Sequence, residues 1–290
     1  MAKKKLTSDD YPVLASITEL AELDVPEDVL DRIQALSELV MDEEEDDFMV
    51  GGGDAGWRPT EAKVLYGTTS KDTVPRAASE GDIFAPMRVL AKKDDREIWK
   101  IIPIAAEATR IYFPDYGSGD NIVELPLEEY KALVPEEEKQ RVKSNGAPYW
   151  NQQYTIYCVD TELSDVFMVR FNKTAAKYGR KALAIIKSLN KKYRRTPETF
   201  AIGMEVLSDK SSSGQEYHNM RAIALKATDE VQPPYMKALV EAIKPHIQQY
   251  IVDRHQGLSE RYRLLEDEAA TFTSGGSIAG AEEQGFEDDM

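Results

Sequence analysis

The 290-residue sequence contains one cysteine, Cys158, and three histidines, none of them at a metal-ligand spacing. One cysteine excludes an intrachain disulfide and a cysteine-based metal cage. No apolar run approaches the roughly 20 residues that span a bilayer. The basic start MAKKKLTSDD is not followed by the apolar core of a signal peptide. We therefore expect a cytoplasmic protein with no membrane partner, no metal and no cofactor.

Convincing catalytic motifs are also missing. Gly51–Gly56 formally matches GxGxxG, but the acidic run Asp42–Asp47 precedes it and would repel a phosphate. Cys158 lies in an apolar, strand-like segment, where an inert buried thiol is expected rather than a nucleophile. Acidic pairs such as Asp82 with Glu97 could hold a magnesium ion, but 52 acidic residues make such pairs common by chance. We predict that the protein is not an enzyme.

Negative charge is absent from one stretch of an otherwise acidic chain. The whole sequence has 52 acidic and 36 basic residues, yet Val166–Arg195 holds ten Lys or Arg and no Asp or Glu. Residues 1–60 carry sixteen acidic and five basic residues, and the part after Arg263 carries eight acidic residues and no basic one. The acidity therefore belongs to the two ends, and the middle of the chain is slightly basic.

Apolar spacing divides the chain into four segments. Residues 1–60 form an acidic N-terminal helical arm and linker, although a helix packed on the main domain explains the pattern equally well. Residues 61–230 form the main domain. Residues 231–268 form a C-terminal helix, which Pro245 would kink or split. Residues 269–290 are too polar to bury a core and are predicted to be a disordered acidic tail.

Short β-prone runs separated by Gly, Pro, Asn and Asp fill the main domain. They lie at 62–66, 82–90, 97–104, 109–113, 154–160, 165–171, 199–207 and 216–225. Two helices are predicted between them, over 126–143 and 173–192. The pattern indicates a mainly β protein with inserted helices, an α+β fold arranged as a small barrel, a sandwich or a mixed domain.

Within the acid-free stretch, residues 173–195 are predicted to form an amphipathic helix with a cationic outer face, with Asn172 as its N-cap. Opposite charges normally alternate on a solvated helix, because such pairs at i,i+4 stabilise it. A uniformly cationic face therefore indicates a polyanion site; a plain solvated face and an acidic membrane surface are the alternatives. On a helical wheel an arc of roughly 120–140° holds Lys173, Lys177, Arg180, Lys181, Lys187, Lys191 and Lys192.

Aromatic and basic residues lie side by side in the flanking segments. Aromatic rings stack on unpaired bases while Lys and Arg neutralise phosphates, a pairing that suits single strands better than duplex. The alternative is that these rings belong to the core. The remaining candidate nucleic-acid-binding residues are Trp99, Lys100, Arg110, Tyr112, Tyr149, Trp150, Arg170, Phe171, Tyr193, Arg194 and Arg195.

The acidic tail imitates a short run of phosphates with one base-like ring. It could occupy the basic surface until nucleic acid displaces it, or dock on a partner protein, or serve only as a solubilising tail. Its candidate residues are Glu282, Glu283, Phe286, Glu287, Asp288 and Asp289.

A basic, aromatic β domain followed by an acidic tail with one aromatic residue resembles the single-stranded DNA-binding proteins of bacteriophages and bacteria. The resemblance implies an OB-like small barrel with peripheral N- and C-terminal helices. It also implies non-catalytic binding of single-stranded DNA, with RNA as the alternative, in phage DNA replication or recombination. The tail would then recruit replication or recombination proteins, and the location would be the host cytoplasm.

Two departures from this family stand out. Its members carry the aromatic residue at or very near the terminus, whereas four residues follow Phe286 here, and the acidic arm 1–60 has no counterpart in them. The alternative function is an interaction or scaffold protein, a viral accessory factor whose basic face binds an acidic protein.

Overall fold

The computed structural model describes residues 58–65, 74–86, 88–115, 121–193, 199–210 and 216–275, with Ser118 and several residues between positions 25 and 36. Side chains of the last helix are described as far as Glu266. Arg194, Arg195 and the predicted tail residues from Glu282 onward lie outside this part of the chain.

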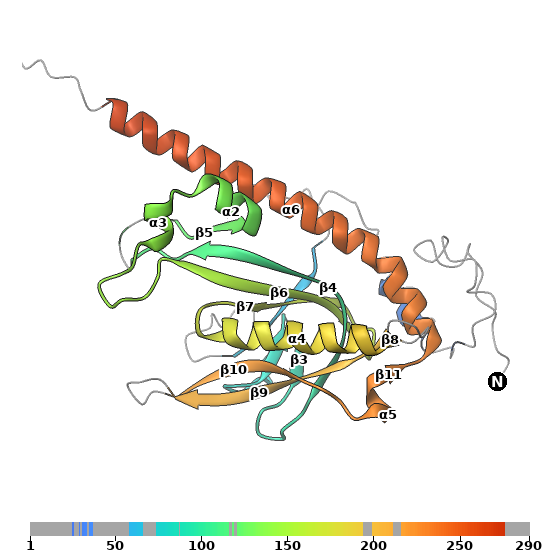
Figure 1. Ribbon diagram of the computed structural model, residues 1–290. Helices are drawn as coiled ribbons and strands as arrows, with labels where there is room; N and C mark the ends of the chain where they lie inside the picture. Colours follow the sequence, from blue (N-terminus) through green and yellow to red (C-terminus); the bar gives the residue numbers. More distant parts are fainter. Residues whose placement is uncertain are drawn as a thin grey trace, which may run out of the picture.

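One large curled sheet of nine strands dominates the structure, in the order β10-β9-β4-β6-β7-β1-β2-β3, with β5 paired to β4 (Figure 1). Its strand pairs are antiparallel, except that β1 lies parallel to β7. A separate two-stranded sheet joins β8 (Thr199–Phe200) to β11 (Val231–Gln232). The nine strands are β1 (Thr60–Val64), β2 (Ile83–Ala85), β3 (Arg88–Ala91), β4 (Trp99–Tyr112), β5 (Val123–Pro126), β6 (Trp150–Asp160), β7 (Val166–Phe171), β9 (Ile202–Lys210) and β10 (Glu216–Ile223).

Helices cover both faces of this sheet. The long helix α6 runs along one face, and α4 lies in the hollow of the other face, between β6 and the β9–β10 pair (Figure 1). The short helices α2 and α3 sit beside β5 at one end of the sheet. The helical elements are α2 (Leu127–Leu133), α3 (Glu136–Gln140), the 3-10 turn η4 (Lys173–Ala175), α4 (Ala176–Tyr193), α5 (Ala227–Glu230) and α6 (Pro234–Gly275).

Strand alternation explains why β6 is buried almost along its whole length. Tyr154, Ile156 and Cys158 point toward α4, whereas Tyr157 and Val159 point toward α6. A strand covered on both faces reads as a continuous apolar run, as central strands of covered sheets do. Burial raises the pKa of the Cys158 thiol well above its ordinary value, as expected for an inert core cysteine.

The predicted mixed fold is confirmed at the level of a large curled sheet, a half-barrel, with several helices. Two segmental predictions were wrong. The helix predicted over 126–143 is broken into α2 and α3, because Pro135 starts a new helix instead of continuing the first one. The runs predicted at 97–104 and 109–113 belong to a single strand, β4.

Two further segments differ from the expected pattern. The run predicted over 82–90 is the hairpin of β2 and β3. Pro245 lies inside α6 and does not split it. The buried side chains of Leu239, Ile243 and Ile247 follow the predicted helical spacing.

The predicted N-terminal helix packs on the main domain. Those residues between Val29 and Leu36 that the structure describes are helical. Ile33 and Leu36 are buried in the same hydrophobic cluster as Leu239 and Ile243 of α6. Of the two interpretations, the packed helix is the one that these contacts support.

The two outer ends of the curled sheet approach each other near His218 of β10. Nζ of Lys93, just after β3, lies 3.3 Å from His218 Nε2, and Ser208 Oγ lies 3.1 Å from Nδ1. Gly81 has a positive φ of 93° and no room for a side chain there, since a Cβ would lie 3.1 Å from the His218 ring. These contacts narrow the opening of the half-barrel.

Gly179 lets α4 lie against the sheet, and its replacement by Ala should destabilise the protein. A Cβ at this position would lie 2.7 Å from Phe171 Cβ and 2.8 Å from Tyr154 Cβ. Because α4 must then move outward, Gly179→Ala should lower the free energy of unfolding by about 1–3 kcal/mol, measured by urea denaturation.

Gly257 in α6 provides the matched control, because a Cβ there would meet nothing within 4 Å. Gly257→Ala should raise the stability by up to about 1 kcal/mol through helix propensity. Equal or higher stability of Gly179→Ala would show that α4 does not depend on this close approach.

Candidate nucleic-acid interface

The acid-free helix predicted from the sequence is η4 with α4, and its basic residues lie on the exposed side. Tyr178, Ala182, Ile186 and Leu189 are buried against the sheet. The seven predicted basic residues are all exposed: Lys173, Lys177, Arg180, Lys181, Lys187, Lys191 and Lys192. This set is called the cationic face below.

Two members of the cationic face are neutralised by acids from distant parts of the chain. Lys177 Nζ lies 3.1 Å from Asp209 Oδ2 on β9, and Lys192 Nζ lies 2.5 Å from Glu230 Oε1 on α5. Burial alone would raise the pKa of Glu230, but hydrogen bonds from Lys192 and Tyr193 hold it below its ordinary value. The sequence of the helix alone could not predict these two acidic partners, because they come from β9 and α5.

The other five members have no acidic partner among the residues that the structure describes. Arg180 donates from Nε to the Tyr154 hydroxyl at 3.4 Å, which leaves its charge uncompensated. From Lys177 to Lys191 the face extends about 21 Å at 1.5 Å per residue. Long, unpaired, like-charged side chains on one exposed face favour an anion that spans several of them.

Lys173 begins the cationic face in a constrained position. Its φ is 46°, and its ammonium lies 3.8 Å from the centre of the Phe113 ring. Burial and the nearby charge of Lys143 lower the pKa of Lys173. Asn172 does not cap the helix with its side chain as predicted, because Nδ2 instead donates to Gln153 Oε1 at 3.4 Å.

Several predicted aromatic residues gather beside Lys173, at the end of β4 and the start of β6. The rings of Tyr112 and Tyr149 stack with centroids 5.5 Å apart, and Trp150 lies 5.5 Å from Tyr112. Arg141 and Lys143, which sequence reasoning missed, lie 4.8 and 5.1 Å from the Tyr149 ring. Cations over ring faces are favourable by about 0.5–1 kcal/mol when exposed.

Acidic residues neutralise much of the positive charge at this aromatic end. Lys143 pairs with Asp115 at 3.6 Å, and Arg141 pairs with Glu138 at 3.4 Å. Arg110 lies over the Tyr130 ring at 5.2 Å. Trp150 and Tyr149 are themselves buried, so this end mainly extends the cationic face through Lys173.

Trp99 and Phe171 were predicted as base-stacking residues, and the structure places both in the core beneath α4. Trp99 is 4% exposed and packs edge-on against Phe167 at 5.1 Å, and Phe171 is 1% exposed. Strand alternation turns these rings toward α4 and their basic neighbours away. An adjacent Lys or Arg in a strand therefore does not indicate an exposed ring.

Lys100 and Arg170 do not join the cationic face either. Lys100 pairs with Asp229 at 3.2 Å. Arg170 follows Met168 in alternation on the α6 side of β7, and its Nη1 lies 3.8 Å from Glu61 Oε1. The predicted binding residues therefore occupy more than one surface.

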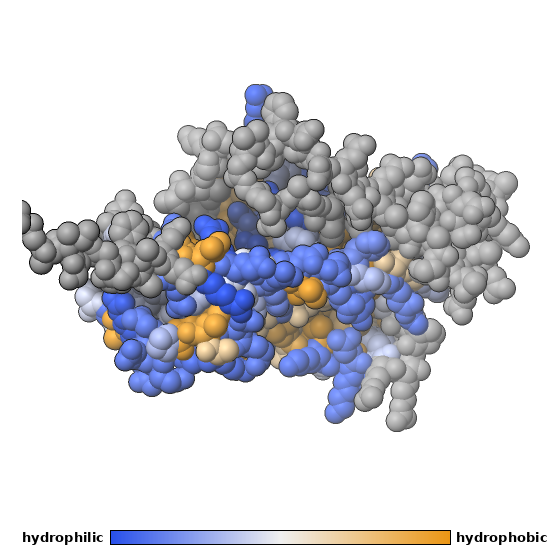
Figure 2. All heavy atoms as spheres, turned by 90° about the horizontal axis from the view of Figure 1, so that it is seen from above, coloured by the Kyte–Doolittle hydropathy of each residue, from blue (hydrophilic) through white to orange (hydrophobic). Residues whose placement is uncertain are grey.

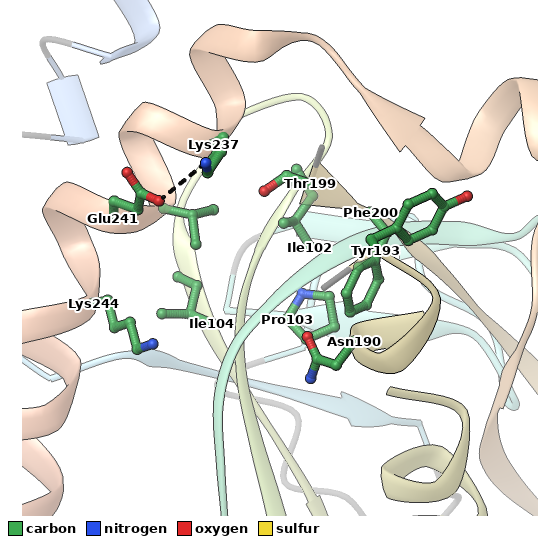
Figure 3. A pocket seen from close by; sticks show the side chains of 11 residues that line it. Ile102, Pro103, Ile104, Asn190, Tyr193, Thr199, Phe200, Lys237, Glu241 and Lys244 are labelled. Atoms are coloured by element: carbon green, nitrogen blue, oxygen red, sulfur yellow. Dashed lines mark ion pairs between the residues drawn. The ribbon is translucent and has the colours of Figure 1, made fainter. Parts of the chain in front are cut away.

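A pocket of about 250 Å³ opens between the C-terminal end of α4, which contributes Asn190 and Tyr193, and the first turns of α6 (Figure 3). Ile102, Pro103 and Ile104 of β4 line its apolar side. Lys237, which pairs with Glu241 at 3.6 Å, and Lys244 line the α6 side. Among the predicted aromatic residues that the structure describes, Tyr193 is the one that lines this pocket.

A buried ionic network between the sheet and α6 was not foreseen. Arg254 Nη1 lies 2.5 Å from Glu107 Oε1, and Arg254 also pairs with Glu124. His255 bonds the second oxygen of Glu107, and the Tyr157 hydroxyl donates to the first at 2.6 Å. Arg254 and His255 showed no partner in the sequence because Glu107 lies about 150 residues earlier. The network holds α6 in one position on the sheet.

Seen from the side of α6, hydrophilic residues cover most of the described surface, broken by separate small hydrophobic patches (Figure 2). No helix in the described ranges is long and apolar enough to cross a membrane. The same residues contain no group of three or more His, Cys, Asp or Glu that could hold a metal ion. Comparisons with protein-family models, curated proteins and solved structures found no match.

The Glu107 network should make stability depend on pH in acid. Burial alone would raise the pKa of Glu107, but the hydrogen bond with His255 and the charge of Arg254 hold it below 4.5. A depressed pKa contributes stability above the unfolded value near 4.5, and this contribution is lost as pH falls through the folded value. The free energy of unfolding should therefore fall below about pH 5.

Glu107→Gln should lower the free energy of unfolding at pH 7 by about 3 kcal/mol and weaken its dependence on pH in acid. Urea denaturation between pH 3 and pH 7 measures both effects. Glu260→Gln, which changes an exposed acid on α6, should change stability by less than about 0.5 kcal/mol. Similar curves for the two variants would contradict the role of the network.

Proposed function

We propose that the protein is a non-catalytic single-stranded DNA-binding protein whose main contact surface is the cationic face of α4. The observation that carries this proposal is the set of five exposed cations without acidic partners in the described part of the chain. Sugar–phosphate satisfies such a surface because each contacted phosphate releases a counterion. A role in phage DNA replication or recombination follows from the family resemblance.

In this proposal the phosphates follow α4 from Lys173 to Lys191. The aromatic end beside Phe113 and Tyr112 lies at the start of this path, and the pocket beside Tyr193 lies at its end. Stacking on a partly exposed ring there would add to the electrostatic binding. Because few aromatic rings are exposed along the path, we expect binding with strong salt dependence and little base preference.

The OB-like small barrel is the finer part of the fold prediction, and it belongs to this proposal. Support comes from the curled sheet and from the approach of its ends at His218. RNA in place of DNA would satisfy the same cations.

A second candidate function has its own supporting observation. Trp99 and Phe171 are buried, so the cationic face presents charge without the stacking rings that were predicted. An acidic partner protein would meet such a surface equally well, as for a scaffold protein. The two functions are distinguished by comparing the affinities for single-stranded oligo-dT, duplex DNA and polyglutamate of equal charge. A single-stranded DNA-binding protein should bind oligo-dT most tightly.

Lys187 and Lys191 should contribute directly to binding. The double variant Lys187→Gln/Lys191→Gln should weaken oligo-dT binding about tenfold or more at low salt and reduce the salt slope by about 1.4, at 0.7 per phosphate contact. Fluorescence anisotropy across a salt series measures the affinity and the slope together.

Lys92→Gln/Arg261→Gln is the matched control, since it removes the same charge from exposed sites away from α4. This control should keep the wild-type slope. Equal losses in the two double variants would mean that only the overall charge matters, which would contradict a defined interface on α4.

The acidic tail should compete with nucleic acid for the cationic face. Deleting residues 276–290, which follow the end of α6, should strengthen oligo-dT binding severalfold at low salt and have little effect at high salt. Equilibrium titration of both proteins tests this. Unchanged affinity at low salt would leave the tail with partner recruitment or solubility as its role.

A further inference from the structure

A second basic pocket lies on the opposite face of the sheet from α4. It has a volume of about 350 Å³ and is formed by β1, β2, β7 and the residues just before β1. Met168, which lines it, belongs to the hydrophobic cluster of α6, whereas its neighbours Phe167 and Val169 belong to that of α4. Alternation along β7 therefore places Arg170 in this pocket and away from the cationic face.

Positive charge exceeds negative charge in the lining of this pocket. Three basic residues, Arg58, Lys63 and Arg170, meet a single acid, Glu61. Glu61 lies 2.8 Å from Lys63 Nζ and 3.8 Å from Arg170 Nη1, so one carboxylate is shared between two cations. The remaining lining polar residue, Thr60, hydrogen-bonds Asp165 and adds no charge.

Arg170 has donors without partners. Its side chain is 28% exposed, and its Nε is buried without a hydrogen-bond partner. The contact with Glu61 at 3.8 Å is too long for a hydrogen bond. Arg58 has no acidic partner at all among the described residues. A guanidinium whose donors lack protein partners favours binding of an anion.

Apolar groups form the rest of the wall. Phe84 and Pro86 of the β2–β3 hairpin and Met168 of β7 line the pocket. The volume falls within the range of small-molecule sites, about 300–1,000 Å³. A ligand that fits these features carries an anion with several acceptor oxygens next to an apolar or planar group.

We propose that this pocket binds a nucleoside monophosphate, with its phosphate held by Arg58 and Arg170. A guanidinium fork pairs with two phosphate oxygens at once in one plane, whereas the ammonium of Lys63 acts as a point charge. The base and sugar lie against Phe84 and Met168. The site is separate from the path along α4, because the sheet stands between them.

Side-chain spectra of the full-length protein test the site directly. The Nε–Hε signal of Arg170 in ¹H–¹⁵N spectra should shift in a saturable manner when thymidine monophosphate is added at low salt. Inorganic phosphate should shift the same signal but bind at least tenfold more weakly, because it lacks the apolar part. Absence of a saturable shift with thymidine monophosphate at millimolar concentration would overturn the proposal.

Variants separate the pocket from general charge. Arg170→Lys keeps the charge but loses the fork and should weaken thymidine monophosphate binding at least tenfold in calorimetry. Arg58→Gln changes an exposed residue and should weaken binding in a protein that still folds. Arg221 lies on β10 and pairs with Glu205 of β9 at 2.5 Å, so Arg221→Gln should leave binding unchanged. Equal effects of Arg58→Gln and Arg221→Gln would contradict a defined site.

The double variant of α4 distinguishes a failure of the pocket proposal from a failure of the proposed function. Lys187→Gln/Lys191→Gln should bind thymidine monophosphate as tightly as wild type, even though its binding to oligo-dT is weakened about tenfold or more. If this variant instead lost the mononucleotide as well, the anion would be bound on α4 and the pocket proposal would be wrong.

Discussion

Packing of α4 into the hollow of the curled sheet is the contact on which the surface of this protein depends. The helix has one apolar side, and the sheet offers one concave apolar face, so docking fixes which side chains remain in water. Gly179 permits the close approach by leaving the space that Phe171 and Tyr154 fill. When the apolar side of the helix packs on the sheet, its basic side chains are left exposed to solvent. The charge of the exposed face thus follows from core packing.

On the opposite face of the sheet, a buried ionic network adds to the apolar packing of α6. There α6 is held by apolar contacts of Leu239, Ile243 and Ile247 and by the buried pairing of Arg254 with Glu107 and Glu124. Apolar packing alone tolerates sliding of a long helix, whereas a buried charge network is satisfied in one register only. The pocket beside Arg170 lies on this side of the sheet, and none of its lining residues comes from α6. The two faces therefore present separate basic surfaces from one sheet.

Local pattern predicted the elements well and their partners poorly. The amphipathic spacing of the acid-free stretch placed α4 and its exposed cations correctly, because helix periodicity depends on near neighbours alone. It could not show that Asp209 and Glu230 pair with Lys177 and Lys192, since those contacts are set by tertiary packing. The same limit explains Trp99 and Phe171, whose exposure depends on which face of the sheet α4 covers. The ionic network of Arg254 could not be predicted either, because it also depends on tertiary packing.

Protection of individual lysines by DNA tests the central claim most directly. Acetic anhydride modifies exposed lysines, and mass spectrometry reports each site separately with and without oligo-dT. We expect strong protection of Lys181, Lys187 and Lys191, with Lys92 and Lys131 unchanged as exposed references in the same sample. Equal modification of Lys181, Lys187 and Lys191 in the presence and absence of bound oligo-dT would contradict the central claim.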